Sequence, residues 1–542
     1  MIKPVVLIIL DGWGIAPDGP GNAVTQAKTP NFDRFWAAYP HTQLEASGMA
    51  VGLPKNENGN SLAGHLNLGA GSIVFQDLPR INMTIANNSF FKIPAFKNAT
   101  EHVKKNQSNL HLLGLIGGGG VHSSLEHLLA LIHLAKTEGI KNLFLHLFTD
   151  GRDSPPTSAP TYIEKIQTEL DKAGLGQIAS LGGRYFGMDR DNRWQRTQKT
   201  YEALTLGKGK QTSSAIQAIR ESYQAGKTDE FIEPVIFINQ KGRPVGLVQD
   251  NDAVIFFNFR IDRPRQLTKA FILPDFEKLV IKKAAFDPYA ERYGLRLYQT
   301  PSQTTTFKRG KVLKNLFFVT MTEYEKGLPA HVAFPPEPVA MPLARVLAEN
   351  NLRQFHLAET EKERFVTYYF DGQREEPFPG EDRLEIPSPK VATYDQKPEM
   401  SAYELTEELL KRLKTNTYHF IVVNYANPDM LGHTGVLQAG IKACEAVDFC
   451  LGKVVTAATN QNGVCVITAD HGNVEEMINL TTGEVDTEHS TNPVPLIIVD
   501  QPSTQGSRVL PLGILADVAP TILALMGIDK PQMMSGCNLL RR

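Results

Sequence analysis

The 542-residue chain has few cysteines, no long apolar run and no excess of one charge. Its four cysteines (Cys444, Cys450, Cys465 and Cys537) form neither a C-x-x-C pair nor the spacing of a zinc ribbon or a disulfide framework. We therefore expect free, mostly buried thiols in a reducing compartment. The seven-residue apolar run before Asp11 is too short for a signal peptide or a membrane span.

The charges are nearly balanced, with 56 Lys and Arg against 58 Asp and Glu. This balance argues against a globally basic nucleic-acid binder. We therefore expect a cytoplasmic protein with neither a nucleic-acid partner nor a membrane partner.

Segments typical of strands alternate with helical ones, which indicates an α/β protein with mainly parallel sheets. Three apolar runs end in polar groups: PVVLIIL before Asp11, HFIVVNY before the loop with Asp429, and GVCVIT before Asp470. Runs of this kind are typical of buried parallel strands. Ligand sites gather beyond the carboxyl ends of such strands, so we expect the three polar loops to share one rim of a sheet.

The length allows two to four domains, and the change in local composition along the chain favours a discontinuous domain with a second domain inserted into it. Arginine-rich loops occur between about residues 76 and 312. We predict one domain from residues 1–75 and 313–542, and a second, inserted domain at 76–312. Capping-box spacing predicts helices starting at Ser123 with Glu126 and at Ser401 with Glu404. Residues 285–312 have weak periodicity and are interpreted as a loop insertion.

Seven side chains near predicted strand ends are candidate ligands of hard divalent cations. They are Asp11, Ser61, Asp429, His433, Asp470, His471 and His489. Two ions can clamp the attacking and leaving oxygens of a transferred phosphoryl group. Each residue also has a simpler interpretation, because Ser61 could cap a helix, the acids could be turn residues and the histidines could be surface groups. The ordered pattern favours a metal site.

The order and wording of the motifs resemble the cofactor-independent phosphoglycerate mutase family, part of the alkaline phosphatase superfamily. The matching stretches are DGWG (11–14), GNS with GHLNLGAG (59–71), FTDGRD (148–153), GRYFGMDRDNRW (183–194), FRIDRPRQL (259–267), ETEK (359–362), PSPKVATYDQKPEMSAYE (387–404), NPDMLGHTG (427–435), TADHGN (468–473) and HSTNPVP (489–495). The resemblance spans about residues 3–537. It implies an alkaline-phosphatase-like α/β domain with an inserted α/β transferase domain.

The resemblance also implies roles for particular residues. One metal would be held by Asp429, His433 and His489, and the other by Asp11, Ser61, Asp470 and His471. The implied ions are two divalent metals, Mn²⁺ first, with Co²⁺ or Zn²⁺ as alternatives. Ser61 would be the metal-activated nucleophile that is phosphorylated during turnover. The implied substrate contacts are His122, Arg152, Asp153, Arg184, Arg190, Arg260, Arg263 and Lys362; read singly, each arginine could instead be a solvated surface residue.

The activity that the resemblance implies is interconversion of 3-phosphoglycerate and 2-phosphoglycerate in glycolysis and gluconeogenesis, independent of 2,3-bisphosphoglycerate. The only partner expected is this small-molecule substrate, and the expected state is a monomer. Closure of the two domains, with hinges near residues 76 and 312, is expected because water must be excluded.

Two departures from the family pattern are visible. Leu62-Ala63 follows Ser61 where the family has Glu-Val, and Ser124 stands where a second histidine is common. The 285–312 insertion is also longer than the usual connection. The alternative function is a metal-dependent phosphomonoesterase of the same superfamily. A non-catalytic metal- or phosphoglycerate-binding protein and a sulfatase-like esterase are weaker alternatives, the latter because no C/S-x-P-x-R motif supports it.

Overall fold

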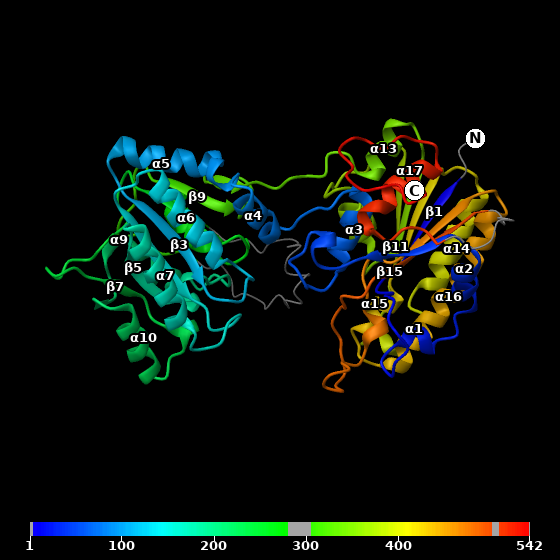
Figure 1. The fold of residues 1–542 in the computed structure, drawn as a ribbon, viewed down its shortest axis with the longest axis horizontal. Coiled ribbons are helices and arrows are strands. Elements are labelled where there is room, and N and C mark those ends of the chain that lie inside the picture. The colour runs from blue at the N-terminus through cyan, green and yellow to red at the C-terminus, as the bar shows by residue number, and fades with distance from the viewer. Residues whose placement is uncertain (1–3, 280–304, 501–508, 541–542) are drawn as a thin grey trace. The chain divides into compact units, whose positions relative to one another are not determined.

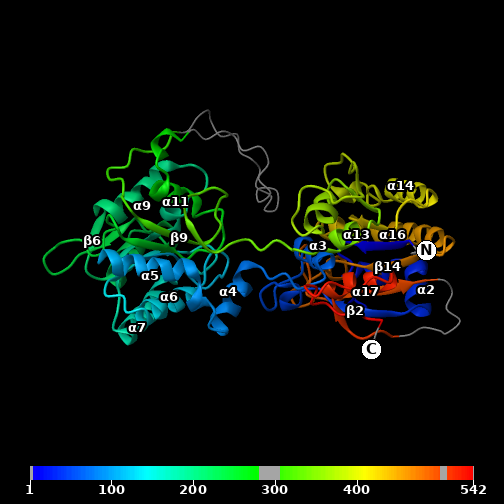
Figure 2. The ribbon, with the colours of Figure 1, turned by 90° about the horizontal axis from the view of Figure 1, so that it is seen from above.

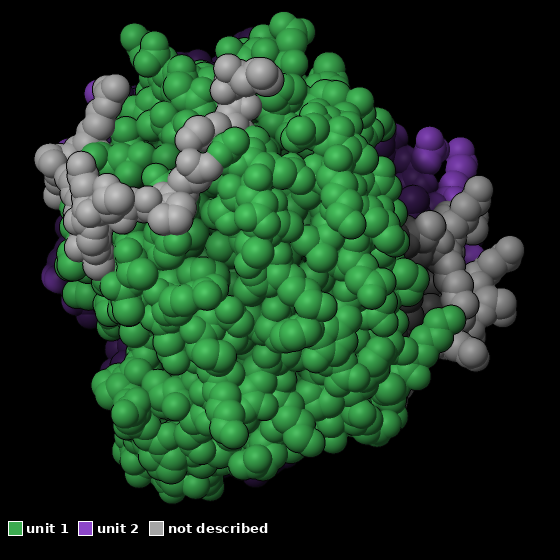
Figure 3. All heavy atoms as spheres, turned by 90° about the vertical axis from the view of Figure 1, so that its right-hand side faces the viewer, with its two compact units in different colours: residues 1–79, 337–542 green, residues 80–336 purple. Residues whose placement is uncertain are grey.

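The computed structural model describes residues 4–279, 305–500 and 509–540. The chain forms two compact units, one from residues 1–79 and 337–542 (unit 1) and one from residues 80–336 (unit 2). Unit 1 therefore uses both chain ends, which form one continuous body in Figure 3. All four cysteines are free, and only Cys537 is exposed. No helix in the described ranges is long and apolar enough to cross a membrane.

The sheet of unit 1 has the strand order β12-β11-β13-β1-β14-β15-β2-β16. Its strands are β1 (Val5–Leu10), β2 (His41–Glu45), β11 (Gln354–Glu359), β12 (Glu381–Ile386), β13 (Phe420–Tyr425), β14 (Val464–Thr468), β15 (Val494–Val499) and β16 (Gly513–Ile514). The three strands expected from apolar runs, β1, β13 and β14, are adjacent, parallel and buried along their whole length. Among the described strands of this sheet, β15 alone pairs antiparallel, with β14 and β2.

Helices cover both faces of this sheet (Figure 1). The helices of unit 1 are α1 (Ala23–Gln26), α2 (Pro30–Ala38), α3 (Ser61–Ala70), α13 (Leu343–Glu349), α14 (Ala402–Lys414), α15 (Asn427–Gly432), α16 (Leu437–Thr459) and α17 (Val518–Leu525). In one layer, α16 packs against α14, α2 and α1. In the other layer, α3 packs against α13 and α17. Helix α4 (Asp77–Ala86) runs across the boundary between the units.

The sheet of unit 2 has the order β10-β9-β8-β3-β4-β5-β7-β6. Its strands are β3 (Leu110–Ile116), β4 (Leu143–Thr149), β5 (Gln177–Gly183), β6 (Lys210–Thr212), β7 (Val235–Phe237), β8 (Ala253–Phe256), β9 (Phe317–Thr322) and β10 (His331–Phe334). Its helices are α5 (Pro94–Asn106), α6 (Leu125–Thr137), α7 (Ala159–Ala173), α8 (Arg184–Gly187), α9 (Trp194–Leu206), α10 (Ala215–Gln224) and α11 (Arg265–Ile272). Figure 2 shows α5, α6 and α7 on one side of this sheet, and α9 and α11 on the other. The expected α/β class with mainly parallel sheets is confirmed.

The second boundary between the units lies later than the predicted residue 312. Strand β9 pairs in parallel with β8, and β10 pairs with β9, so both strands extend the sheet of unit 2. The chain leaves unit 2 only at residue 336. Of the insertion predicted at 285–312, residues 285–304 lie outside the described residues.

Neither of the two predicted capping boxes forms, although both helices exist. Helix α6 is capped by Ser124, whose side chain accepts from Glu126 N, while the Ser123 hydroxyl donates to the Leu115 carbonyl at 2.6 Å. Ser401 precedes α14 without capping it, because its hydroxyl donates to the Pro387 carbonyl at 2.8 Å. In both cases a tertiary contact takes the serine that local spacing had assigned to the helix.

Two glycines let separate segments meet at the rim of the unit 1 sheet. Gly12 has a φ of +74°, and a Cβ there would lie 2.6 Å from the Asp429 Cα. A Cβ at Gly64 of α3 would clash with the Asp470 backbone. Glycine therefore permits the positive φ at one position and the close approach at the other.

Candidate functional site

Three aspartates from three strand ends meet at one rim of the unit 1 sheet, as the sequence predicts. Asp11 follows β1, Asp429 lies in α15 after β13, and Asp470 follows β14. All three are buried, and the backbone N–H of Asp429 donates to the Asp11 carbonyl at 2.9 Å. Three carboxylates in one buried place need cationic partners.

Two histidines complete a tight group with Asp429. His433 Nε2 lies 3.0 Å from His489 Nε2, and the two nitrogens are 3.4 Å and 3.3 Å from Asp429 Oδ1. The other nitrogen of His433, Nδ1, lies 2.8 Å from the Thr487 carbonyl, which orients the ring. Three potential ligand atoms therefore converge on one point.

Ser61 lies beside a second group, at the first turn of α3. The helix is capped by Asn60, whose side chain accepts from Ala63 N, so the helix-cap interpretation of Ser61 is wrong. Ser61 Oγ lies 3.0 Å from His471 Nε2. That nitrogen is 3.4 Å from Asp470 Oδ2 and 3.6 Å from Asp11 Oδ1. The serine hydroxyl is therefore free of capping and faces the acidic cluster.

Lys362 lies between the two groups. Its Nζ donates to Asp11 Oδ1 at 2.6 Å, to Asp429 Oδ2 at 2.6 Å and to Ser61 Oγ at 2.8 Å. Burial opposes the charged ammonium, but Asp11 and Asp429 outweigh it and raise the pKa of Lys362 above its usual range. Lys362 was predicted among the substrate contacts, and it belongs to unit 1, directly against the candidate nucleophile.

The carboxylates share too little positive charge. Burial and the neighbouring Asp470 raise the pKa of Asp11 to about 7, although Lys362 acts against them. Burial also disfavours charge on Asp429, but there Lys362 and His433 prevail and hold its pKa well below the usual range. One ammonium thus stabilises one of these two carboxylates and leaves the other short of positive charge.

A divalent metal ion fits this set of donors. Bonds of about 2.0–2.2 Å from one ion separate its ligand atoms by roughly 2.8–3.6 Å, the range that His433, His489 and Asp429 span. In addition, the buried Asp470 Oδ2 has no hydrogen-bond partner, so it retains its lone pairs for a cation. Carboxylate and imidazole are ligands that manganese, cobalt and zinc accept.

The predicted substrate contacts of unit 2 also gather in one place. Arg184 follows β5 and donates to both Asp150 and Asp153. Asp262 pairs with Arg190 at 2.6 Å and with Arg260 at 3.2 Å. Asp150 and Asp262 were not predicted as site residues, although Asp150 lies within the FTDGRD motif and Asp262 within the FRIDRPRQL motif.

His122 lies between the same acids. Its Nε2 is 3.7 Å from Asp153 Oδ2, and its Nδ1 is 3.7 Å from Asp262 Oδ1. Burial and the positive charge of Arg184 nevertheless lower the pKa of His122 to about 2. The imidazole is therefore neutral.

The arginines repel one another. Burial and the charges of Arg184 and Arg190 lower the pKa of Arg263 to about 10. Arg263 donates to the Met188 carbonyl at 3.2 Å, whereas Arg152 lies at the edge, more than half exposed, 3.6 Å from Glu230. A crowd of like charges in a partly buried place is suited to a polyanion such as a phosphate with a carboxylate.

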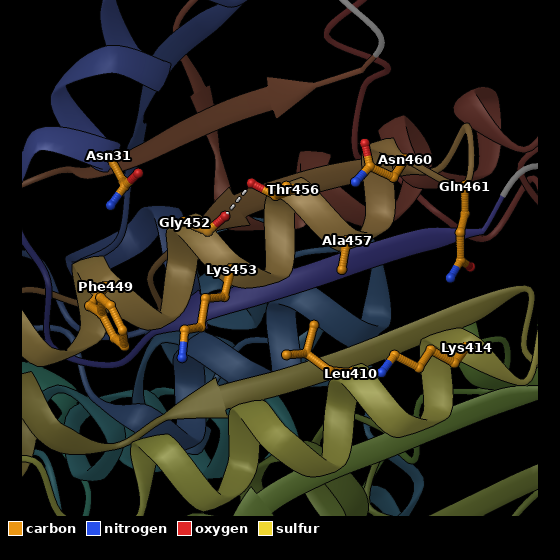
Figure 4. A pocket seen from close by; sticks show the side chains of 10 residues that line it. All are labelled: Asn31, Leu410, Lys414, Phe449, Gly452, Lys453, Thr456, Ala457, Asn460 and Gln461. Atoms are coloured by element: carbon orange, nitrogen blue, oxygen red, sulfur yellow. Dashed lines mark hydrogen bonds between the residues drawn. The ribbon is translucent and has the colours of Figure 1, made fainter.

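Unit 1 also has a surface groove, whose lining side chains are drawn in Figure 4. It has a volume of about 740 Å³ and lies between α14 and α16. Its lining residues are Asn31, Leu410, Lys414, Phe449, Gly452, Lys453, Thr456, Ala457, Asn460 and Gln461. The lining includes none of the predicted site residues and no carboxylate or histidine.

Fold and sites together define an α/β protein with a serine beside a candidate metal centre in one unit and an arginine-rich candidate anion site in the other. A family model described as "BPG-independent PGAM N-terminus" matches residues 81–326, almost all of unit 2. The 2,3-bisphosphoglycerate-independent phosphoglycerate mutase of Chloroflexus aggregans is 51% identical over 543 residues, covering 100% of this chain and 99% of the relative. The relative from Moorella thermoacetica is 49% identical and covers 99% and 98%.

A solved structure agrees with these relatives. Phosphoglycerate mutase from Leishmania mexicana, crystallised at low cobalt concentration, is 30% identical, covers 99% of this chain and 97% of its own, and has a TM-score of 0.58. The chain belongs to the 2,3-bisphosphoglycerate-independent phosphoglycerate mutase family.

Proposed function

We propose that this chain interconverts 3-phosphoglycerate and 2-phosphoglycerate through a phosphoserine at Ser61, without 2,3-bisphosphoglycerate. The observation that carries the proposal is the position of Ser61 Oγ, 2.8 Å from Lys362 Nζ and 3.0 Å from His471 Nε2. The serine stands at the start of the ten-residue helix α3, where backbone N–H groups favour a phosphate. The names of the full-length relatives support the substrate.

Two divalent ions would complete the unit 1 site. Asp429, His433 and His489 would hold one, and Asp11, Ser61, Asp470 and His471 the other; Mn²⁺ is the proposed metal. When bound, such ions lower the pKa of a coordinated hydroxyl and stabilise charge on a transferring phosphoryl group. Unit 1 is thus proposed as the metal-binding, phosphatase-like domain.

The reaction has two halves. In the first, Ser61 Oγ bonds to phosphorus, the bond from phosphorus to the substrate oxygen breaks, and the serine proton ends on the glycerate hydroxyl. In the second, the other glycerate hydroxyl attacks the phosphoserine, Ser61 Oγ leaves, and the proton returns to it. The Lys362 ammonium, 2.8 Å away, stabilises negative charge on Ser61 Oγ in both halves.

Unit 2 is proposed to hold the organic part of the substrate. Its contacts would be His122, Arg152, Asp153, Arg184, Arg190, Arg260 and Arg263. Arginine forks bind carboxylate and phosphate in a bidentate manner, and the neutral His122 can bond to a hydroxyl without adding charge. Domain closure, a monomeric state and a cytoplasmic location stay predictions.

The testing experiment uses purified protein, stripped of metal and reloaded with Mn²⁺, without 2,3-bisphosphoglycerate. Formation of 2-phosphoglycerate from 3-phosphoglycerate is followed with coupled enolase, and free phosphate is measured in parallel. We expect metal-dependent isomerisation with little phosphate release. Phosphate release without isomerisation would instead establish a phosphomonoesterase, with Leu62-Ala63 as the first departure to revert.

A further inference from the structure

His65 is a buried histidine of α3 that none of the roles above uses. It lies one helical turn after Ser61 and is fully buried. Its Nδ1 is 2.9 Å from the Ser61 carbonyl and 3.2 Å from Asp470 Oδ2. Its Nε2 is 2.9 Å from Asn424 Nδ2, at the end of β13. One ring thus contacts the helical turn of Ser61, strand β13 and the loop that follows β14.

The contacts of Asn424 determine which nitrogen of His65 carries the proton. Asn424 Nδ2 donates to Asp11 Oδ2 at 2.6 Å, so the amide cannot be turned without placing its oxygen against a carboxylate. The second hydrogen of the same nitrogen points to His65 Nε2, which must accept it. His65 Nδ1 then carries the hydrogen and donates to the Ser61 carbonyl. Both nitrogens of the ring are therefore engaged.

These bonds exclude His65 as a metal ligand, although one of its ring nitrogens lies within 4.8 Å of carboxylate oxygens of Asp11 and Asp470. A ligand nitrogen needs a free lone pair directed at the ion. The only lone pair of the ring accepts from Asn424, and its N–H is directed at Ser61. The nearby Asp470 Oδ2 makes no hydrogen bond, so it stays available to a cation.

We propose that His65, with Asn424, is a positioning residue that fixes Ser61 and Asp11 relative to each other for the ion beside the serine. Asp11 is oriented by Asn424, Asn424 by His65, and the carbonyl of Ser61 by the same ring. Phe365 packs against the ring at 5.5 Å between centroids and restricts its rotation. This inference rests on the proposed two-metal site, and outer partners of metal ligands change metal affinity by about 10–100-fold.

Two substitutions of His65 test its bond to the Ser61 carbonyl and its bond to Asn424 separately. In His65→Asn, the side-chain amide can replace Nδ1 as the donor to Ser61 but does not reach Asn424. In His65→Gln, the amide oxygen can replace Nε2 as the acceptor from Asn424, while the donor to Ser61 is lost. His419→Asn is the matched control, because His419 lies just before β13 at the opposite end of the strand and accepts from Arg353 N at 3.1 Å.

The readout is Mn²⁺ binding to the metal-stripped full chain, measured by isothermal titration calorimetry. In the His433→Ala background, which weakens the other ion, we expect each His65 variant to raise the Kd of the ion beside Ser61 about 10–100-fold. With His433 intact, both variants should still bind two ions, and the Tm of the metal-free protein should match that of His419→Asn. Comparison of the two variants shows whether the bond of His65 to Ser61 or its bond to Asn424 contributes more to metal affinity.

Three results would overturn the inference. Loss of one ion from the stoichiometry in both variants would make His65 a ligand. A lower Tm of the metal-free protein with an unchanged Kd would make its role purely structural. An unchanged Kd and Tm would remove any role. Failure of the proposed function is distinguishable, because it would show as absent metal-dependent isomerisation by the wild-type chain.

Discussion

The site in unit 1 and the site in unit 2 are opposites in charge. Two aspartates, Asp11 and Asp429, pair with one buried lysine in unit 1, and burial together with the charge of Asp470 raises the pKa of Asp11 to about 7. In unit 2 several arginines crowd together, and burial with Arg184 and Arg190 lowers the pKa of Arg263 to about 10. In both sites burial and then like charges shift the pKa of a central group towards its neutral form.

The contrast shows what each site lacks. Under the proposed function, excess negative charge around Ser61 would be relieved by bound cations, and excess positive charge around Arg263 by a bound anion. In the proposed reaction, the site in unit 2 would recognise the phosphorylated hydroxy acid, and the site in unit 1 would transfer its phosphoryl group. The following predictions test this division, beginning with the largest expected effect.

Replacement of Ser61 should remove catalysis without removing the charge contrast. In Ser61→Ala, kcat should fall on the order of 10⁴-fold or more, because no oxygen is left to accept the phosphoryl group. The Asn60 cap remains, so α3 should keep its stability. The coupled enolase assay measures the loss, and substrate binding by calorimetry is the control. Near-normal turnover would exclude the phosphoserine.

Removal of the buried lysine beside Asp11 and Asp429 should sharpen the contrast between the two sites. In Lys362→Met, the free energy of unfolding of the metal-free protein should fall by about 3–5 kcal/mol, because buried carboxylates lose their partner. Saturation with Mn²⁺ should reduce this loss, since the ions supply positive charge. Urea unfolding with EDTA and with Mn²⁺ measures both values. The control Lys453→Met, at an exposed lysine of α16, should change stability by less than about 0.5 kcal/mol. An equal loss with and without metal would contradict a charge-balancing role.

The rise in KM on replacing an arginine of unit 2 should depend on how deeply that arginine is buried. In Arg263→Met, the KM for 3-phosphoglycerate should rise about 10–100-fold, because a desolvated charge-assisted contact is lost. In Arg152→Met, whose wild-type side chain is 57% exposed, the rise should be less than about 10-fold. Steady-state kinetics on both variants measures the difference. An equal rise in KM in both variants would show that burial does not determine how much each arginine contributes to substrate binding.

His122 should make stability depend on pH. Its folded-state pKa of about 2 lies below the ordinary value of 6.5, because of burial and Arg184. Between these values the unfolded chain binds a proton that the folded chain does not, so stability falls as pH decreases. The slope from this group is about 1.4 kcal/mol per pH unit at most. His122→Gln should flatten the urea-derived stability profile between about pH 6.5 and pH 5. An unchanged slope would mean that the imidazole is charged in the folded protein.

Much of the unit 1 rim could be predicted from the sequence. The runs that became β1, β13 and β14 are apolar on both faces because helices cover both sides of the sheet. Their ends had to be polar where they leave the core, so Asp11, Asp429 and Asp470 could be expected at one edge. Their distances and the place of Lys362 between them could not.

Other features depended on contacts between distant segments. The boundary at residue 336 follows from the pairing of β9 with β8, which no local signal near residue 312 reveals. Ser123 and Ser401 have the spacing of capping residues, yet both donate to carbonyls outside their helices. Asn424 lies in an apolar strand and His65 in a helix, and the local sequence around neither residue predicts that the two side chains are in contact.

The sequence by itself determined the α/β class, the strand ends that carry the acids and the order of the motifs, because these depend on local hydrophobicity and residue type. Only the tertiary structure decided which strands pair, where unit 2 ends, and which hydrogen bonds orient Ser61, Asp11 and Lys362. Such bonds join residues up to hundreds of positions apart, and their geometry exists only once the core has brought the strands together.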